Sequence, residues 1–181
     1  MRKLIMWNVI SLDGFFEGDQ PWDLEFHSQI WGEELERFSI EQLEEADFLL
    51  FGRKTYEGMA AHWTKAEGVI ADYMNQIPKL VGSRTLTSVD WHNSSLIPEN
   101  LTEEIKALKQ QKGKDFYVFG SAELCETLIQ DDLIDEYRIG ITPVILGKGR
   151  PLFRNLSTVK KLNLISTQPL KTGGIIARYS R

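Results

Sequence analysis

Two uninterrupted apolar runs, at 48–51 and 116–119, are the strongest pattern in the sequence. Neither run contains the polar alternation of a half-exposed strand. Such continuous apolar runs are typical of strands that are covered on both faces. Other strand-like runs cover 3–10, 78–84, 89–92, 133–144, 159–167 and 175–180. The pattern therefore predicts eight strands. The last two are separated by Pro169 and Gly173-Gly174 and resemble a terminal hairpin.

Amphipathic segments lie between these strands. Within 122–130 the apolar residues follow the spacing of one buried helical stripe, and Ser121 is the expected N-cap. The strand at 48–51 leads through Gly52 into a short helix. We expect further helices at 69–77 and 98–112, an irregular helix within 23–37, and a short helix that begins with a capping box at Ser39. Strands alternating with helices predict an α/β fold.

Composition narrows the class of protein. The chain has 181 residues, and we expect 1–181 to form a single domain. Its net charge of −5 argues against a broad nucleic-acid or anionic-membrane surface. The only cysteine, Cys125, lies on the apolar helical stripe, which favours a buried structural thiol. Asn8 interrupts the N-terminal apolar run, and no run approaches the length of a membrane span, so we expect a cytoplasmic protein.

Small and basic residues follow three of the predicted strands. Gly52, Arg53, Lys54 and Thr55 follow one, Ser83 and Arg84 another, and Gly120 and Ser121 a third. Ligands of open α/β sheets bind outside the carboxyl ends of the strands, and a helix N-terminus favours an anion. We therefore expect one phosphate-binding crevice, with ordinary turns and solvated surface cations as the alternative.

The 13–27 segment offers candidates for the rest of a ligand site. Phe15 and Phe16 beside a flexible polar loop predict a pocket wall, or else a packed surface loop. Asp13, Asp23, Glu25 and His27 could orient a substrate or relay a proton, and Asp13 is the first choice for a catalytic group. A turn, cap or surface role is the alternative for each. The other histidines stand in no cluster with ligand spacing, so we expect no metal.

Five motifs in order resemble the dihydrofolate reductase-like superfamily, most closely the reductase domain of the bifunctional riboflavin-biosynthesis deaminase-reductase and its stand-alone relatives. They are Ser11-Leu12-Asp13-Gly14, the 50–56 segment LFGRKTY, the 119–124 segment FGSAEL, the 133–136 segment LIDE and the 143–153 segment PVILGKGRPLF. Together they span nearly the whole chain. The resemblance implies a three-layer α/β/α fold with a mixed, mostly parallel eight-stranded sheet.

The resemblance also implies an NADPH-dependent reductase that transfers a hydride to a C=N or C=O group of a small pterin-like or pyrimidine-like heterocycle. Arg53, Lys54, Thr55, Ser83 and Arg84, with Gly52, match segments that hold the adenosine 2′-phosphate and neighbouring diphosphate. The nicotinamide would lie near Val9, Ile10 and Phe16. The diphosphate-binding turn of the family corresponds to Gly120, Ser121, Ala122, Glu123 and Leu124. Relatives often form homodimers, and the 143–153 loop could contribute.

Two departures keep alternatives open. The family has two successive glycines where this chain has Gly120-Ser121, and His27 stands where dihydrofolate reductases carry a carboxylate. Folate reduction is therefore not expected. A non-catalytic NADPH-binding or dimerisation module with the same fold is the main alternative, and a phosphosugar-binding protein is another.

Overall fold

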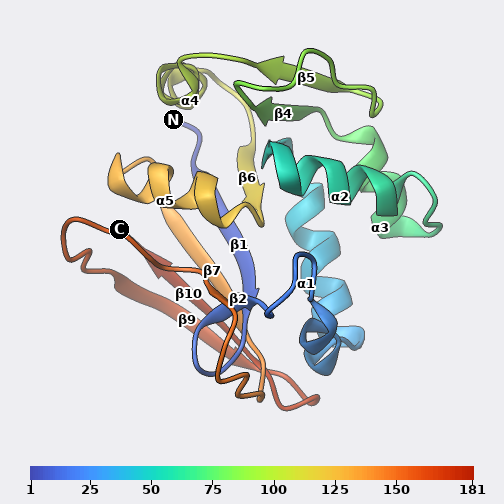
Figure 1. The fold of residues 1–181 in the computed structure, drawn as a ribbon, viewed down its shortest axis with the longest axis vertical. Helices are drawn as coiled ribbons and strands as arrows, with labels where there is room; N and C mark the ends of the chain where they lie inside the picture. The colour runs from blue at the N-terminus through green and yellow to red at the C-terminus, as the bar shows by residue number, and fades with distance from the viewer.

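A mixed eight-stranded sheet runs through the computed structural model, which describes residues 1–181 (Figure 1). The strand order is β5-β4-β3-β6-β1-β7-β10-β9, and the neighbours from β5 to β7 are parallel. β10 runs antiparallel to β7 and to β9, which confirms the predicted hairpin. The strands are β1 Leu4–Ile10, β3 Ala46–Gly52, β4 Lys79–Gly82, β5 Ser94–Ile97, β6 Asp115–Phe119, β7 Glu136–Ile141, β9 Asn163–Pro169 and β10 Ile175–Ser180.

Helices cover both faces of this sheet. A core on one face joins α5 and α4 to β1, β3 and β6, and a second core on the other face joins α1, α2 and α3 to the same strands. The predicted three-layer α/β/α architecture is therefore confirmed. The helices are α1 Glu33–Glu44, α2 Arg53–Trp63, α3 Val69–Gln76, α4 Leu101–Gln110 and α5 Ala122–Gln130, preceded by the 3-10 helix η1 Glu25–Ile30. No helix combines the length and apolar character that a membrane crossing requires.

The two continuous apolar runs occupy the middle of the sheet, as predicted. Leu49, Leu50 and Phe51 of β3 and Phe116 to Val118 of β6 are fully buried, because helices cover both of their faces. The apolar stripe on α5, which includes Cys125, is buried as well. This burial raises the pKa of the Cys125 thiol to about 12. This thiol is therefore protonated and unreactive at neutral pH.

Several predicted elements differ from the structure. Ser39 does not begin a helix, because α1 starts at Glu33 and the Ser39 hydroxyl donates to the Leu35 carbonyl within it. The fourth strand lies at Ser94–Ile97 rather than 89–92, where Trp91 is instead buried in a loop. The helix expected from residue 98 begins at Leu101. A two-stranded ribbon of β2 Phe15–Glu17 and β8 Arg150–Pro151 was not predicted.

A buried ion pair network joins β7 to β10. The Glu136 carboxylate, 3% exposed, accepts hydrogen bonds from Arg138 Nε at 2.7 Å and Arg178 Nε at 2.8 Å. Burial opposes ionisation of Glu136, but the hydrogen bonds from the two arginines outweigh it and hold the pKa below its ordinary value. The paired strands are thus fixed by charge as well as by backbone hydrogen bonds.

Candidate active site

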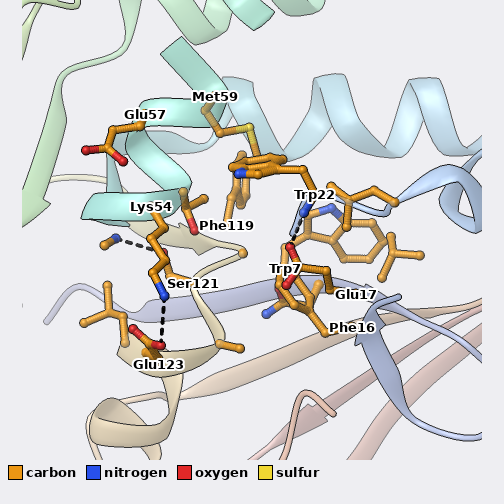
Figure 2. A pocket seen from close by; sticks show the side chains of 18 of the residues that line it. Trp7, Phe16, Glu17, Trp22, Lys54, Glu57, Met59, Phe119, Ser121 and Glu123 are labelled. Carbon is orange, nitrogen blue, oxygen red and sulfur yellow. Dashed lines mark hydrogen bonds and ion pairs between the residues drawn. The ribbon is translucent and has the colours of Figure 1, made fainter. Parts of the chain in front are cut away.

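A cavity of about 850 Å³ lies across the C-terminal ends of β1, β3, β4 and β6 (Figure 2). Gly52 ends β3, Gly82 ends β4 and Phe119 ends β6, and all three line the cavity. Because these strands are parallel, their ends lie at one edge of the sheet, where open α/β folds bind ligands. Ligand pockets have volumes of about 300–1,000 Å³, so this cavity has the size of a small-molecule site.

Two strand-to-helix turns meet at one end of the cavity. Gly52 leads into α2, and Gly120-Ser121 leads into α5; the Ser121 hydroxyl accepts a hydrogen bond from the Gly52 amide at 2.8 Å. Gly120 has φ +66°, and a Cβ there would lie 3.0 Å from the Thr55 side chain. The two turns are therefore packed closely and tied by one hydrogen bond.

Ser121 occupies the N-cap position of α5, but the predicted capping bond is absent. Its φ of 60° is left-handed and its hydroxyl serves Gly52 instead of an N–H group of α5. Neither α2 nor α5 has a side-chain cap. The first N–H groups of both helices thus lack intrahelical partners beside the cavity, at the positive ends of two helix dipoles.

The cations at this end differ in their pairing. Arg53 lies 3.3 Å from Glu57, and Lys54 Nζ lies 3.4 Å from Glu123 Oε1. Arg84 has no hydrogen bond or ion pair with any side chain, although it lines the same cavity. Its guanidinium is therefore free to bind an anion.

The turn that carries Arg84 is ordered by Ser83. The Ser83 hydroxyl accepts hydrogen bonds from the amides of Thr85 at 3.2 Å and Leu86 at 3.1 Å. We call the cavity-lining residues of 52–57, 82–85 and 120–124 the polar end. It combines helix N-termini, hydroxyls and one unpaired cation.

Glu123 is, with Glu57, one of two acidic residues of this end, and basic residues surround it. Arg150 Nη2 donates to Glu123 at 2.7 Å, while Arg150 Nη1 lies 3.8 Å from Glu17. Burial would raise the pKa of Glu123, but Arg150 and Lys54 outweigh it and lower the pKa. Arg150 belongs to the β2–β8 ribbon, and sequence reasoning did not assign it to the site, although it lies in the recognised 143–153 motif.

Aromatic side chains form the opposite end of the cavity. Trp22 lies beside Met59 on one side, and Trp7 and Phe16 lie across from it (Figure 2). The Trp22 ring rests against α2, where a Cβ on Gly58 would lie only 1.9 Å from it. We define the aromatic end of the cavity as the side chains of Trp7, Phe16, Trp22, Trp31 and Trp63.

Glu17 fixes the loop that carries Trp22. The Trp22 amide donates to Glu17 Oε1 at 2.5 Å, and Trp22 itself has a left-handed φ of 64°. Such a backbone conformation is uncommon for a bulky residue and needs support from its surroundings. The contact with Gly58 and the bond to Glu17 provide that support.

His27 also lines the aromatic end. Its Nε2 lies 3.1 Å from the Phe16 carbonyl, which can only accept, so the ring hydrogen is on Nε2. Burial lowers the pKa of His27 more than this hydrogen bond raises it. The ring is therefore neutral at neutral pH, with Nδ1 left as an acceptor.

The structure brings most of the sequence-predicted site residues together. Val9, Phe16 and all the predicted residues of the polar end line the cavity, whereas Ile10 is buried in the core beneath α5.

Asp13, the predicted catalytic group, does not line the cavity either. Its carboxylate accepts from the Ser11 hydroxyl at 2.7 Å and the Gly147 amide at 2.7 Å, and the Ser11 bond is the main cause of its lowered pKa. These contacts indicate that Asp13 positions the 143–153 loop.

Sequence reasoning missed most of the aromatic end. Trp7, Trp31 and Trp63 come from β1, from the residue after η1 and from the end of α2, and no local pattern links them. No group of three or more His, Cys, Asp or Glu side chains could hold a metal ion.

Known structures define the fold class first. Dihydrofolate reductase from Enterococcus faecalis, solved with NADP(H), is similar with a TM-score of 0.63 and 16% identity, covering 99% of this chain and 96% of that one. A putative riboflavin biosynthesis protein from Shewanella sp. PV-4 is similar with a TM-score of 0.82 and 23% identity, covering 99% and 98%. The fold is therefore dihydrofolate reductase-like, as the sequence motifs predicted.

Sequence comparison identifies the family. Residues 2–176 match the RibD C-terminal domain, so the chain belongs to that family. The uncharacterized protein YyaP of Bacillus subtilis (strain 168) is 29% identical over 191 residues, which covers 98% of this chain and 94% of YyaP. The resemblance to riboflavin-biosynthesis reductases is thereby confirmed.

Proposed function

We propose that this protein is an NADPH-dependent reductase that transfers a hydride to a C=N or C=O group of a small pterin-like or pyrimidine-like heterocycle. Membership of the RibD C-terminal domain family supports a reductase that acts on a pyrimidine. The observation that carries the proposal is the unpaired Arg84 beside Ser83 at one end of a cavity whose other end is aromatic.

The polar end fits the charged parts of NADPH. The uncapped starts of α2 and α5 offer N–H groups for the diphosphate, and Gly120 allows its backbone to come close. Arg84 and the hydroxyls of Ser83 and Thr85 offer donors for the adenosine 2′-phosphate. Glu123 does not oppose this fit, because Arg150 and Lys54 balance its charge.

The aromatic end fits the reacting partners. Val9 and Phe16 would flank the nicotinamide, and Trp7 and Trp22 would cover the substrate from opposite sides. NADPH, when bound, supplies a hydride and its two electrons to the substrate carbon and becomes NADP⁺. The substrate nitrogen or oxygen then takes a proton from solvent. The apolar walls keep water away from the reacting carbon.

A titration with NADPH and with NADH tests the cofactor assignment. We expect NADPH to bind about 10–100-fold more tightly, since a guanidinium hydrogen bond to a charged group contributes about 1.5–3 kcal/mol. Nicotinamide fluorescence would follow binding. Equal affinities, or no binding of either nucleotide, would contradict the proposal. NADPH absorbance with a panel of pterins and pyrimidines then tests turnover.

A non-catalytic NADPH-binding or dimerisation module is the second candidate. The neutral His27, in place of a carboxylate, favours it because no acidic group faces the substrate from that position. Tight NADPH binding without oxidation by any acceptor would support this candidate. The homodimer stays a prediction that analytical ultracentrifugation would check. A cytoplasmic location is part of the proposal, and the single buried Cys125 requires no oxidising compartment.

A further inference from the structure

The ionisable side chains of the cavity are divided unevenly between its two ends. Outside the polar end, the lining contains only three of them, those of Glu17, His27 and Arg150. The remaining lining there is apolar or neutral, and the five rings of the aromatic end, together with that of Phe119, dominate it. A ligand group in this region therefore meets few charges.

Arg150 is the only permanent cation near the aromatic end, and it is already paired. Its guanidinium lies 2.7 Å from Glu123 and 3.8 Å from Glu17, and Glu123 also lies 3.4 Å from Lys54 Nζ. The four side chains of Glu17, Glu123, Lys54 and Arg150 carry no net charge when all of them are ionised. This group therefore offers a phosphate no uncompensated positive charge.

His27 cannot replace the missing cation. It is neutral, and its only N–H group is used by the Phe16 carbonyl. Nδ1 is an acceptor, and a phosphate offers acceptors as well, so the two cannot pair. A heterocycle with an N–H or O–H donor would be complementary to Nδ1.

We propose that the substrate is a flat, uncharged heterocycle that carries no phosphate group and lies between the rings of the aromatic end. Such rings gain from stacking and from apolar burial, whereas a phosphate dianion would lose its hydration without gaining a cation. The inference rests on the proposed function, because it assumes that NADPH occupies the polar end. It adds the charge class of the substrate.

Riboflavin and its 5′-phosphate, FMN, are a matched pair of probes that share one flat ring system. Isothermal titration calorimetry would compare them on the full chain saturated with NADP⁺, so that the polar end is filled. We expect riboflavin to bind at least about tenfold more tightly than FMN. Equal or tighter binding of FMN, or no binding of riboflavin, would overturn the inference.

The Glu17→Gln variant tests the electrostatic cause. It removes one negative charge and keeps an oxygen that can accept from the Trp22 amide. We expect the preference for riboflavin to fall about threefold, as for a partly exposed charge. The matched control is Glu25→Gln, which makes the same change outside the cavity lining and should leave the preference unchanged. An unchanged preference in Glu17→Gln would refute the electrostatic explanation.

The cofactor titration separates this inference from the proposed function. If NADPH fails to bind but riboflavin is preferred in its absence, the reductase proposal fails and the charge preference stands. If NADPH binds and FMN is preferred, only the inference on the substrate fails.

Discussion

Arg84→Ala removes the one unpaired cation of the polar end and should weaken NADPH binding selectively. A unit charge pair about 4 Å apart gains about 1 kcal/mol in water and about 4 kcal/mol at an effective dielectric constant of about 20. Arg84 is exposed, so its interaction with a phosphate lies between these limits. About 2 kcal/mol corresponds to a loss of about 30-fold in NADPH affinity.

The affinity for NADH should change less than about twofold in the same variant, because NADH lacks the 2′-phosphate that Arg84 would bind. Fluorescence titration of both nucleotides provides the comparison. Arg84→Lys should lie between the wild type and Arg84→Ala, since it keeps the charge and loses the planar fork.

Arg37→Ala is the matched control for this experiment. Arg37 is also exposed, but it lies on α1 and does not line the cavity. Its removal makes the net charge of −5 more negative by the same single unit and should leave both affinities unchanged. If Arg84→Ala weakened the binding of NADPH and of NADH by the same factor, or weakened the binding of neither nucleotide, the assignment of Arg84 to the 2′-phosphate would be wrong.

Three further substitutions test the fold and the other end of the site. Glu136→Gln should lower the free energy of unfolding in urea by roughly 3–5 kcal/mol, because it leaves two arginines without their buried carboxylate. The pKa of Glu136 is lower in the folded state than in the unfolded state, so its contribution to the free energy of unfolding is complete above the unfolded pKa. This contribution is lost as the pH falls through the folded pKa. The variant should therefore lose less stability in acid than the wild type. Gly58→Ala should displace the Trp22 ring, because the added methyl group would overlap with it. The tryptophan emission should then change and riboflavin binding should weaken, while circular dichroism shows an intact fold. An unchanged emission would contradict the contact. Asp13→Asn should lower the melting temperature by a few degrees, because it loses charge-assisted hydrogen bonds, and should leave NADPH affinity unchanged. Lost turnover at unchanged stability would instead support the catalytic role predicted for Asp13.

The centre of the fold could be predicted because its pattern is local. The apolar runs of β3 and β6 contain no polar alternation, and glycines mark the point where each strand ends. The 48–51 and 116–119 segments thus identified the central strands and the edge that carries the cavity. The order of motifs then indicated the family.

The elements that were missed depend on contacts between distant segments. β8 has only two residues, and its pairing with β2 shifts in register, so neither shows a strand period. At Ser39 the capping pattern was real, but Gly32 and the following acidic residues begin α1 earlier and place Ser39 inside the helix. Local propensity was overridden there by the packing of the whole helix.

The aromatic end shows the same limit at the level of the site. Trp22 meets Gly58 across 36 positions of the chain, and nothing in the sequence around either residue indicates this contact. The glycine is needed because any side chain there would occupy the space of the indole. A glycine inside a helix costs about 1 kcal/mol relative to alanine, which suggests that the contact with Trp22 offsets this loss.

Ser121 explains how the turn tolerates the loss of the second glycine. A left-handed backbone at this position suits glycine, and a serine there is strained by about 1–2 kcal/mol. Its hydroxyl, however, accepts a partly buried hydrogen bond from the Gly52 amide, and an intramolecular hydrogen bond contributes about 1 kcal/mol. The two effects are of similar size, so the serine can stand where a glycine is expected. The same hydrogen bond joins the starts of α2 and α5. The distance between the two helix N-termini is therefore fixed, and an anion bound at one of them would lie at a fixed distance from the other.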